Sequence, residues 1–278
     1  MPRIFDFGGR EVERTVTVAS LRALKGTPKA GGGPVAQVTA ETAEEAAAAE
    51  AAGIEMIVCR AANVSRVREG SRRLFVTAAL GFAEAVTGDE ILRTAFGAIT
   101  AGADAVITGR GYDAVRKLAD EQIPVVGHLG FVPRKSTWVG SIRAFGKTAT
   151  EAFELWDRFR RLEDAGAFAV ECELIPAAVM AEIGSRTGLV TISLGSGSDA
   201  DVIFLFTSDI CGENERLPRH ARAWGNLARL HEAVRTERLA ALSGFRAAVR
   251  MGDFPAKANV AGIADEEIEA FRRDIERR

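Results

Sequence analysis

Short runs of apolar, mostly β-branched residues recur along the chain, and the longer segments between them carry apolar positions at helical spacing. Near-continuous apolar runs are typical of strands in a parallel sheet that is covered on both faces. The pattern predicts eight strands, at residues 35–39, 56–59, 74–77, 105–108, 124–128, 168–173, 189–194 and 202–206.

The segments between these runs carry the start signals of helices. Thr42 and Glu45 form a capping-box pattern before an alanine-rich stretch that stops at Gly53. Asp89 begins a second predicted helix, and Thr150 opens a third. The repeated alternation of strand and helix predicts an α/β fold, and eight such units are expected to close into a (β/α)8 TIM barrel.

The residues outside this repeat are interpreted as accessory. We expect residues 1–33 to form an N-terminal segment with a short helix near 18–24 and a Gly-rich linker. Residues 34–256 would form the barrel with its C-terminal helices, and residues 257–278 a charged helix. The stretch 213–251 is basic and predicted to be helical. No aromatic stacking pattern accompanies it, which favours a solvated face or an oligomer contact over a nucleic-acid surface.

Composition narrows the class of protein. The chain of 278 residues is 47% hydrophobic and 27% charged, with a net charge of −2 that gives no field toward nucleic acid or an anionic membrane. We find no apolar run long enough to span a bilayer, and no signal-peptide pattern. The three cysteines lack metal-ligand spacing, which indicates reduced thiols. These features predict a cytoplasmic protein that acts on a small molecule.

Two glutamates lie where a barrel places its chemistry, at the carboxyl end of a strand. Glu173 follows an apolar run, and partial burial in the barrel mouth would make its carboxylate a stronger base. Glu171, two residues earlier, is expected to point to the same side of the strand. The alternative is that either glutamate forms a structural ion pair with an arginine such as Arg60 or Arg110.

Two further strand ends carry candidate binding residues. His128 ends the fifth run between Gly127 and Leu129-Gly130, and the flanking glycines allow a ligand to approach the backbone closely. It could equally be a hydrogen-bonded rim residue. Ser196 lies in a Gly-Ser-Gly turn that could present backbone N–H groups to a carboxylate or phosphate, or could simply be a tight turn.

Several segments together resemble the ketopantoate hydroxymethyltransferase family. They are IPVVGHLGFVPRKSTWVGSIRAFGKT, EDAGAFAVECELIPAAVMAEI, LVTISLGSGSDADVIFLFTSDICG, RLPRHARAW and FRAAVRMGDFP. The resemblance runs from about residue 35 to 256 and is most specific between 123 and 224. It implies a TIM barrel of the phosphoenolpyruvate/pyruvate superfamily type, with Glu173 in the place of the catalytic base.

The resemblance also implies an activity. Members of that family use a divalent metal, usually Mg2+, to bind a 2-oxo acid, and a glutamate removes the proton beside the carbonyl. The enolate adds to a one-carbon unit carried by methylenetetrahydrofolate, on the way to pantothenate. Family members form homo-oligomers, which implies the same for this chain.

The sequence departs from the family at the metal site. The positions of two metal-ligand aspartates, a lysine and a second glutamate hold Ala61, Ala79, Ile107 and Gly109. A hard divalent cation needs oxygen ligands, which alanine does not supply, so we predict no metal at these positions. Arg60 and Arg110 are the residues expected to replace the metal's charge and bind the substrate carboxylate.

Three hypotheses follow from these residues. In the first, a diverged enzyme uses Glu173 as general base and His128 to position or polarise the substrate, with Arg60, Arg110, Ser196 and Glu171 binding it. The reaction would be proton abstraction beside a carbonyl, with aldol addition, retro-aldol cleavage or isomerisation. In the second, a degenerate barrel binds a ligand or partner without turnover. In the third, a relocated metal site is built by Glu171, Glu173, Asp201 and Asp209.

Overall fold

The computed structural model of the chain describes residues 3–25, 33–81 and 84–277. Apart from Gly33, the Gly-rich linker expected before residue 34 lies outside the described residues. Two compact units are present, Met1–Trp224 and Gly225–Arg278.

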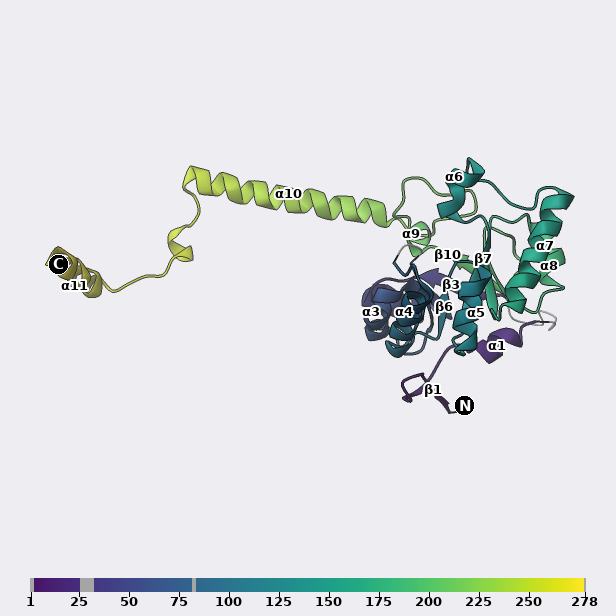
Figure 1. Cartoon of the computed structure of the whole chain (residues 1–278). Helices are drawn as coiled ribbons and strands as arrows, with labels where there is room; N and C mark the ends of the chain where they lie inside the picture. Colours follow the sequence, from purple (N-terminus) through teal and green to yellow (C-terminus); the bar gives the residue numbers. More distant parts are fainter. Residues whose placement is uncertain (1–2, 26–32, 82–83, 278) are drawn as a thin grey trace. The chain divides into compact units, whose positions relative to one another are not determined.

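Eight parallel strands of the first unit close into a barrel, which confirms the predicted fold (Figure 1). Their order around the barrel follows the chain, with the last strand, β10, paired to the first, β3. The strands are β3 (Val35–Thr39), β4 (Met56–Arg60), β5 (Phe75–Ala79), β6 (Ala105–Ile107), β7 (Val125–Gly130), β8 (Ala169–Glu173), β9 (Val190–Leu194) and β10 (Val202–Leu205).

Helices connect successive strands as far as β9 and cover the outside of the barrel, whereas residues 195–201 between β9 and β10 contain no helix. They are α2 (Ala43–Ala51), η1 (Ala61–Asn63), α3 (Val64–Gly70), α4 (Gly88–Thr100), α5 (Tyr112–Asp120), η2 (Pro133–Lys135), α6 (Ser136–Val139), α7 (Ala149–Asp164), α8 (Ala177–Gly184) and α9 (Thr207–Ile210). The capping box of Thr42 and Glu45 is confirmed at the start of α2. The predicted start of α7 at Thr150 is wrong, because the side chain of Thr148 accepts the hydrogen bond from the Glu151 N–H.

Strand alternation divides the apolar residues between two cores. Residues such as Ile57 and Val170 point outward and pack against the helices. Their neighbours in sequence, such as Met56 and Ala169, point inward and fill the barrel. A strand buried on both faces therefore reads as one continuous apolar run, which is the pattern seen in the sequence.

The N-terminal segment lies at the amino end of the barrel. A hairpin of β1 (Ile4–Phe5) and β2 (Glu11–Val12) precedes the predicted helix, which is α1 (Val18–Arg22). The hairpin was not predicted, since two-residue strands leave no apolar run. Leu21 of α1 is fully buried within the core cluster inside the barrel. The segment therefore closes the end opposite the strand carboxyl termini.

The second unit contains α10 (Leu227–Met251), η3 (Lys257–Asn259) and α11 (Asp265–Glu276). The boundary at residue 225 differs from the expected one at 257, which followed the reach of the family resemblance. The prediction that 213–251 is helical throughout is wrong, because residues 213–226 lie outside any helix. Pro218 and Gly225 in this stretch disfavour helix. Within the described chain, none of the helices has the length and apolar character needed to cross a membrane.

Candidate active site

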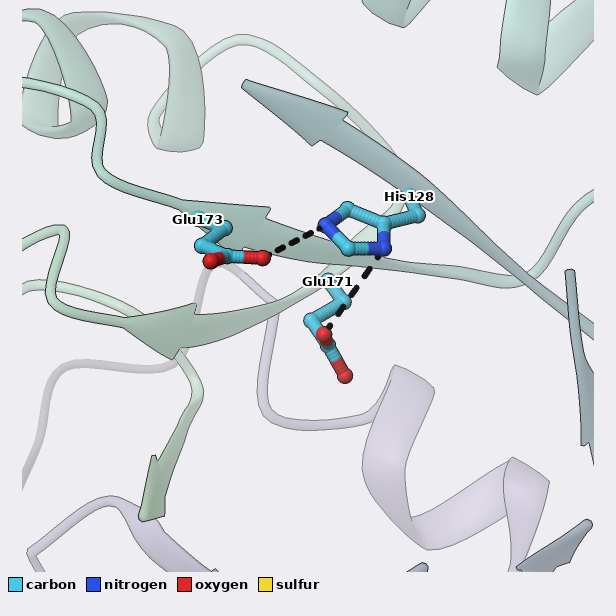
Figure 2. Close-up of side chains that lie close together, drawn as sticks. All are labelled: His128, Glu171 and Glu173. Carbon is cyan, nitrogen blue, oxygen red and sulfur yellow. Dashed lines mark hydrogen bonds and ion pairs between the residues drawn. The ribbon is translucent and has the colours of Figure 1, made fainter. Parts of the chain in front are cut away.

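Three titratable side chains meet inside the barrel at the carboxyl ends of β7 and β8. These strands are paired with His128 opposite Glu171 and Gly130 opposite Glu173. Residues in register on neighbouring strands share a face, and residues two apart on one strand also share it. His128, Glu171 and Glu173 therefore point to the same side, as the prediction for the two glutamates required (Figure 2).

The histidine lies between the two carboxylates, one at each ring nitrogen (Figure 2). Its Nε2 is 3.1 Å from Glu173 Oε2 and 3.0 Å from the carbonyl oxygen of Phe131. Its Nδ1 is 3.8 Å from Glu171 Oε1. Because a carbonyl oxygen only accepts hydrogen bonds, Nε2 must carry a hydrogen. Nδ1, facing Glu171, is then the nitrogen that gains or loses a proton.

Burial and charge set the protonation of this group. All three side chains are buried, with about a tenth of each exposed. Burial disfavours the charged imidazole, but the hydrogen bond with Glu173 and the charge of Glu171 outweigh it and raise the pKa of His128. Burial also raises the pKa of Glu171, while the positive charge of His128 opposes this. The arrangement favours an imidazolium held between two glutamates.

The backbone around Glu173 is held in an unusual conformation. The Phe131 N–H donates to the Glu173 carbonyl oxygen at 2.8 Å. Gly130 allows this approach, since it has φ +88° and a Cβ there would lie 2.2 Å from the same oxygen. Leu174 has φ +52°, a strained value for a residue with a side chain. Such strain often marks functional sites, and here it immediately follows the proposed base.

Ser196 lies in the predicted turn but is buried. Its hydroxyl donates to the Cys172 carbonyl oxygen at 2.7 Å and accepts from the Ile175 N–H at 2.9 Å. These bonds tie the end of β8 to the turn after β9. Its role in substrate binding stays a prediction.

The two arginines expected to bind substrate lie differently. The side chain of Arg60 is 79% exposed, and its Nε is 3.9 Å from Glu41 Oε1. Arg110 donates from Nη1 to the carbonyl oxygens of Ala85 and Val86. Among the ion pairs of the described residues, neither arginine is paired with Glu171 or Glu173, so the predicted alternative of an arginine–glutamate pair is wrong. In the described structure, His128 lies beside both glutamates instead of an arginine.

The four carboxylates of the hypothetical relocated metal site do not come together. Asp201 precedes β10 at the amino end of the barrel, where it binds Thr191 and lies 3.0 Å from Lys25. Glu173 ends a parallel strand and therefore lies at the opposite end. The Asp209 carboxylate accepts from Asn214 at 2.8 Å. Among the described residues, only His128, Glu171 and Glu173 are spaced to hold a metal ion.

The residues present do not fit the Mg2+ site implied by the family resemblance. Mg2+ prefers octahedral oxygen ligation and keeps several waters, whereas Ala61, Ala79 and Gly109 offer no side-chain oxygen. The His128 cluster is nearly closed to water, and a metal bound at Nε2 would displace both of its hydrogen bonds.

The sequence pointed to His128, Glu171 and Glu173 separately but missed features that assemble them. The Phe131 carbonyl and the Leu174 backbone leave no signal in residue type. The ring of His220 lies against Gly195 at the end of β9, whereas the sequence places His220 in a helical stretch with a solvated face or an oligomer contact. A histidine in the family-like segment RLPRHARAW was the available signal.

Comparison with known proteins agrees with this architecture. The family model for ketopantoate hydroxymethyltransferase matches residues 59–257. A 3-methyl-2-oxobutanoate hydroxymethyltransferase of Thermococcus kodakarensis is 30% identical, covering 91% of this chain and 94% of its own. The enzyme of that name from Chlorobium phaeobacteroides is 36% identical, with 73% of each chain covered.

One solved structure supports the same fold. The crystal structure of 2,3-dimethylmalate lyase, a PEP mutase/isocitrate lyase superfamily member, covers 90% of this chain and 91% of its own. Its TM-score is 0.51 at 15% identity, so the likeness concerns the barrel alone. The family model and the relatives of 30–36% identity together show that this chain belongs to the ketopantoate hydroxymethyltransferase family.

Proposed function

We propose that the chain is a transferase or lyase of the ketopantoate hydroxymethyltransferase type that removes a proton beside the carbonyl of a 2-oxo acid. Carbon–carbon bond formation or cleavage would follow. The observation that carries this proposal is the buried contact of 3.1 Å between His128 and Glu173 at the carboxyl end of the barrel. The names of the relatives support a 2-oxo acid such as 3-methyl-2-oxobutanoate as substrate.

Glu173 is the proposed general base. Its carboxylate accepts the substrate proton, so negative charge passes from the glutamate to the substrate enolate. The imidazolium of His128 stays beside both and stabilises the enolate electrostatically, because positive charge counts for more where water is excluded. Glu171 keeps His128 protonated through its charge at the Nδ1 side.

The substrate carboxylate needs a cationic partner at the rim. Arg110 follows β6 and lines a cavity with His128, so it is the better placed of the two predicted arginines. Arg60 would have to leave Glu41 to contribute. Guanidinium groups bind carboxylates with two parallel hydrogen bonds, which would also orient the carbonyl toward His128.

The side chains present do not fit an Mg2+ site, so each step of the proposed chemistry uses the chain's own residues. Proton exchange at the substrate should then persist in EDTA. Loss of exchange in EDTA that added Mg2+ restores would contradict this part of the proposal.

Three further points belong to the proposal. Methylenetetrahydrofolate is the one-carbon donor implied by the family. A homo-oligomer is supported by the apolar side chains that α10 exposes. A cytoplasmic location is supported by the three free cysteines, of which Cys59 and Cys172 are buried.

The deciding experiment is exchange of the C3 proton of 3-methyl-2-oxobutanoate in D2O, followed by NMR. Glu173→Gln should lower the exchange rate by about 100-fold or more, the usual contribution of a general base. Glu182→Gln, at an exposed glutamate of α8, is the matched control and should exchange at the wild-type rate.

A folded Glu173→Gln variant with unchanged exchange would remove the proposal. Absence of exchange in the wild-type protein across a panel of 2-oxo acids would favour the alternative of a degenerate barrel that binds without turnover.

A further inference from the structure

We propose that a cavity at the amino end of the barrel, between the β1–β2 hairpin and the first residues of β5 and β6, binds a monocarboxylate that carries an apolar chain. This cavity lies at the end opposite the catalytic cluster, because a barrel of parallel strands has its carboxyl ends on one side only. None of His128, Glu171 and Glu173 lines it. The inference therefore goes beyond the proposed reaction and does not depend on it.

The cavity has a volume of about 230 Å³. The hairpin forms one wall, the segment from Arg14 to Val18 forms the second, and Phe75, Ala103 and Asp104 form the third. A volume of this size holds about eight water molecules, at roughly 30 Å³ each. It therefore suits a small molecule with a short chain better than a nucleotide or a peptide.

Most of the lining is apolar, and part of it is uncovered. The apolar lining residues are Ile4, Phe5, Phe7, Val12, Val16, Val18, Phe75 and Ala103. Phe5 and Phe7 expose 58% and 54% of their surfaces, although phenylalanine is among the residues most often buried. A hairpin with strands of only two residues is marginal by itself, so its position depends on what packs against it. An apolar chain in the cavity would remove part of this lining from water and add to that packing.

The charged lining residues and their ion-pair partners carry one net positive charge. The two carboxylate oxygens of Asp104 lie 2.7 Å from Arg14 Nε and 2.6 Å from Arg68 Nη2. Asp6, the other acidic residue of the described lining, lies 2.9 Å from Arg10 Nε. Three guanidinium groups against two carboxylates leave one positive charge. One bound monoanion would balance it, whereas a dianion would exceed it.

The shared aspartate leaves the two arginines in mutual repulsion. Both side chains are largely buried, with 5% of Arg14 and 12% of Arg68 exposed. Burial lowers the pKa of Arg68, and the charge of Arg14 adds to this effect, although Asp104 opposes it. A carboxylate beside Arg14 would relieve this repulsion.

Arg14 also supplies hydrogen-bond donors for such an anion. A guanidinium group has five N–H donors. Nε of Arg14 donates to Asp104, and Nη1 donates to the carbonyl oxygens of Glu13 and Arg72. Within the described chain no residue accepts from Nη2, so its two N–H groups are the donors left for a ligand carboxylate. The cavity therefore offers a charged anchor for the carboxylate and apolar walls for the chain.

Binding there is expected to stabilise the protein without turnover. Phe75 lines the cavity and belongs to the core inside the barrel, as does Leu21 of α1. A ligand that fills the cavity would thus support the closed amino end of the barrel. Since it binds the folded state, it should raise the melting temperature as its concentration rises.

The test is titration calorimetry with hexanoate, hexan-1-ol and acetate at pH 7.5 and fixed ionic strength. Hexan-1-ol lacks the charge, and acetate lacks the chain. We expect saturable binding of hexanoate, and binding weaker by about tenfold or more for hexan-1-ol, which loses the charge-assisted hydrogen bonds. Acetate should also bind more weakly, because it leaves the apolar lining uncovered.

Two variants locate the binding site. Arg14→Gln should weaken hexanoate binding by about tenfold or more. Arg22→Gln, at an exposed arginine of α1 outside the lining, is the matched control and should bind as wild type. Thermal melting without probe checks that both variants fold.

Phe7→Ala keeps the test decisive if Arg14→Gln does not fold, because this ring is more than half exposed. It should weaken hexanoate binding by about threefold or more through lost apolar contact. Phe153→Ala, at an exposed ring of α7 outside the lining, is its control.

Three results would overturn the proposal. They are the absence of saturable hexanoate binding, equal affinity for hexan-1-ol and hexanoate, and displacement of hexanoate by 3-methyl-2-oxobutanoate, which would place the probe in the active site. Glu173→Gln should keep wild-type affinity for hexanoate. A failure of the proposed reaction would therefore leave this inference standing and can be told apart from its own failure.

Discussion

At the scale of single residues, the site depends on one imidazole that contacts two carboxylates. Glu173 and the Phe131 carbonyl share the Nε2 hydrogen of His128, while Glu171 faces Nδ1. Removing a single partner would leave a buried charge uncompensated, which usually costs more than the pair contributes. The three residues are therefore expected to act as one unit in both stability and catalysis.

This unit predicts how stability depends on pH. The pKa of His128 is raised above its ordinary value of 6.5 and that of Glu171 above 4.5. Stability from a raised pKa is fully present below the unfolded value and is lost as pH rises through the folded value. The free energy of unfolding in urea should therefore be lower at pH 8.5 than at pH 6.

Variants can show which residues cause this pH dependence of stability. His128→Gln/Glu171→Gln removes both titrating groups with little change of shape, so its stability should fall less between the two pH values. His231→Gln, on exposed α10, should keep the wild-type fall. If the unfolding free energy of the double variant falls as steeply as that of the wild-type protein, the pH dependence arises from other groups.

Gly130 gives a second prediction at this scale. Gly130→Ala combines a left-handed backbone with a contact of 2.2 Å to the Glu173 carbonyl, whereas Gly53→Ala has φ +79° and nothing within 4 Å. Gly53→Ala should cost about 1 kcal/mol of unfolding free energy. Gly130→Ala should cost more by about 1–3 kcal/mol, because the backbone itself must move. If the two variants lose equal unfolding free energy in urea, the close contact between Gly130 and the Glu173 carbonyl is not needed for stability.

At the scale of elements, the start of α7 differs from the sequence prediction. Thr148 and Thr150 are both good capping residues, and the sequence alone does not choose between them. The chain entering α7 is held by Glu151, which accepts from the N–H groups of Gly146 and Lys147. This places Thr148, and not Thr150, at the cap.

The cap can be tested directly by substitution. Thr148→Ala should lower the free energy of unfolding by about 1 kcal/mol, since the Glu151 N–H loses its acceptor. Thr150→Ala, inside the first turn and exposed, should leave stability unchanged or slightly higher because alanine is the better helix former. Urea unfolding of the two variants, compared with wild type, shows whether Thr148 or Thr150 caps the start of α7.

At the scale of the whole molecule, the barrel carries the site and the second unit carries a helix without a core of its own. None of the residues of α10 is buried, and Leu230, Val234, Leu242, Phe245 and Val249 expose between 47% and 61% of their surface along one stripe. A stripe at this spacing is the face that a helix normally buries.

We therefore expect light scattering to give a mass that is a multiple of 29.7 kDa. Leu242→Lys/Phe245→Lys should reduce that mass, because charges placed in an apolar contact must be desolvated. Ala240→Lys, on the opposite side of α10, is the control and should leave the assembly intact. A monomeric wild-type protein would contradict this expectation.

Much of the fold followed from the sequence because its signals are local. Each of the eight apolar runs became a barrel strand, and the order of helices and strands left few other ways to bury them. The period of two along β8 placed Glu171 and Glu173 on one face. The carboxyl ends of the predicted strands led to Glu173 and His128, whose catalytic roles are proposals.

Contacts between distant segments were decided only by the tertiary structure. Closure of the barrel put His128 between two carboxylates and Asp201 at the far end, away from Glu173. It left Arg60 at an exposed rim and Arg110 beside the cavity that His128 also lines. Residue type and spacing are properties of the chain, but register, burial and charge pairing depend on which strands become neighbours. The strands and the position of Glu173 were therefore readable in advance, whereas its partner was not.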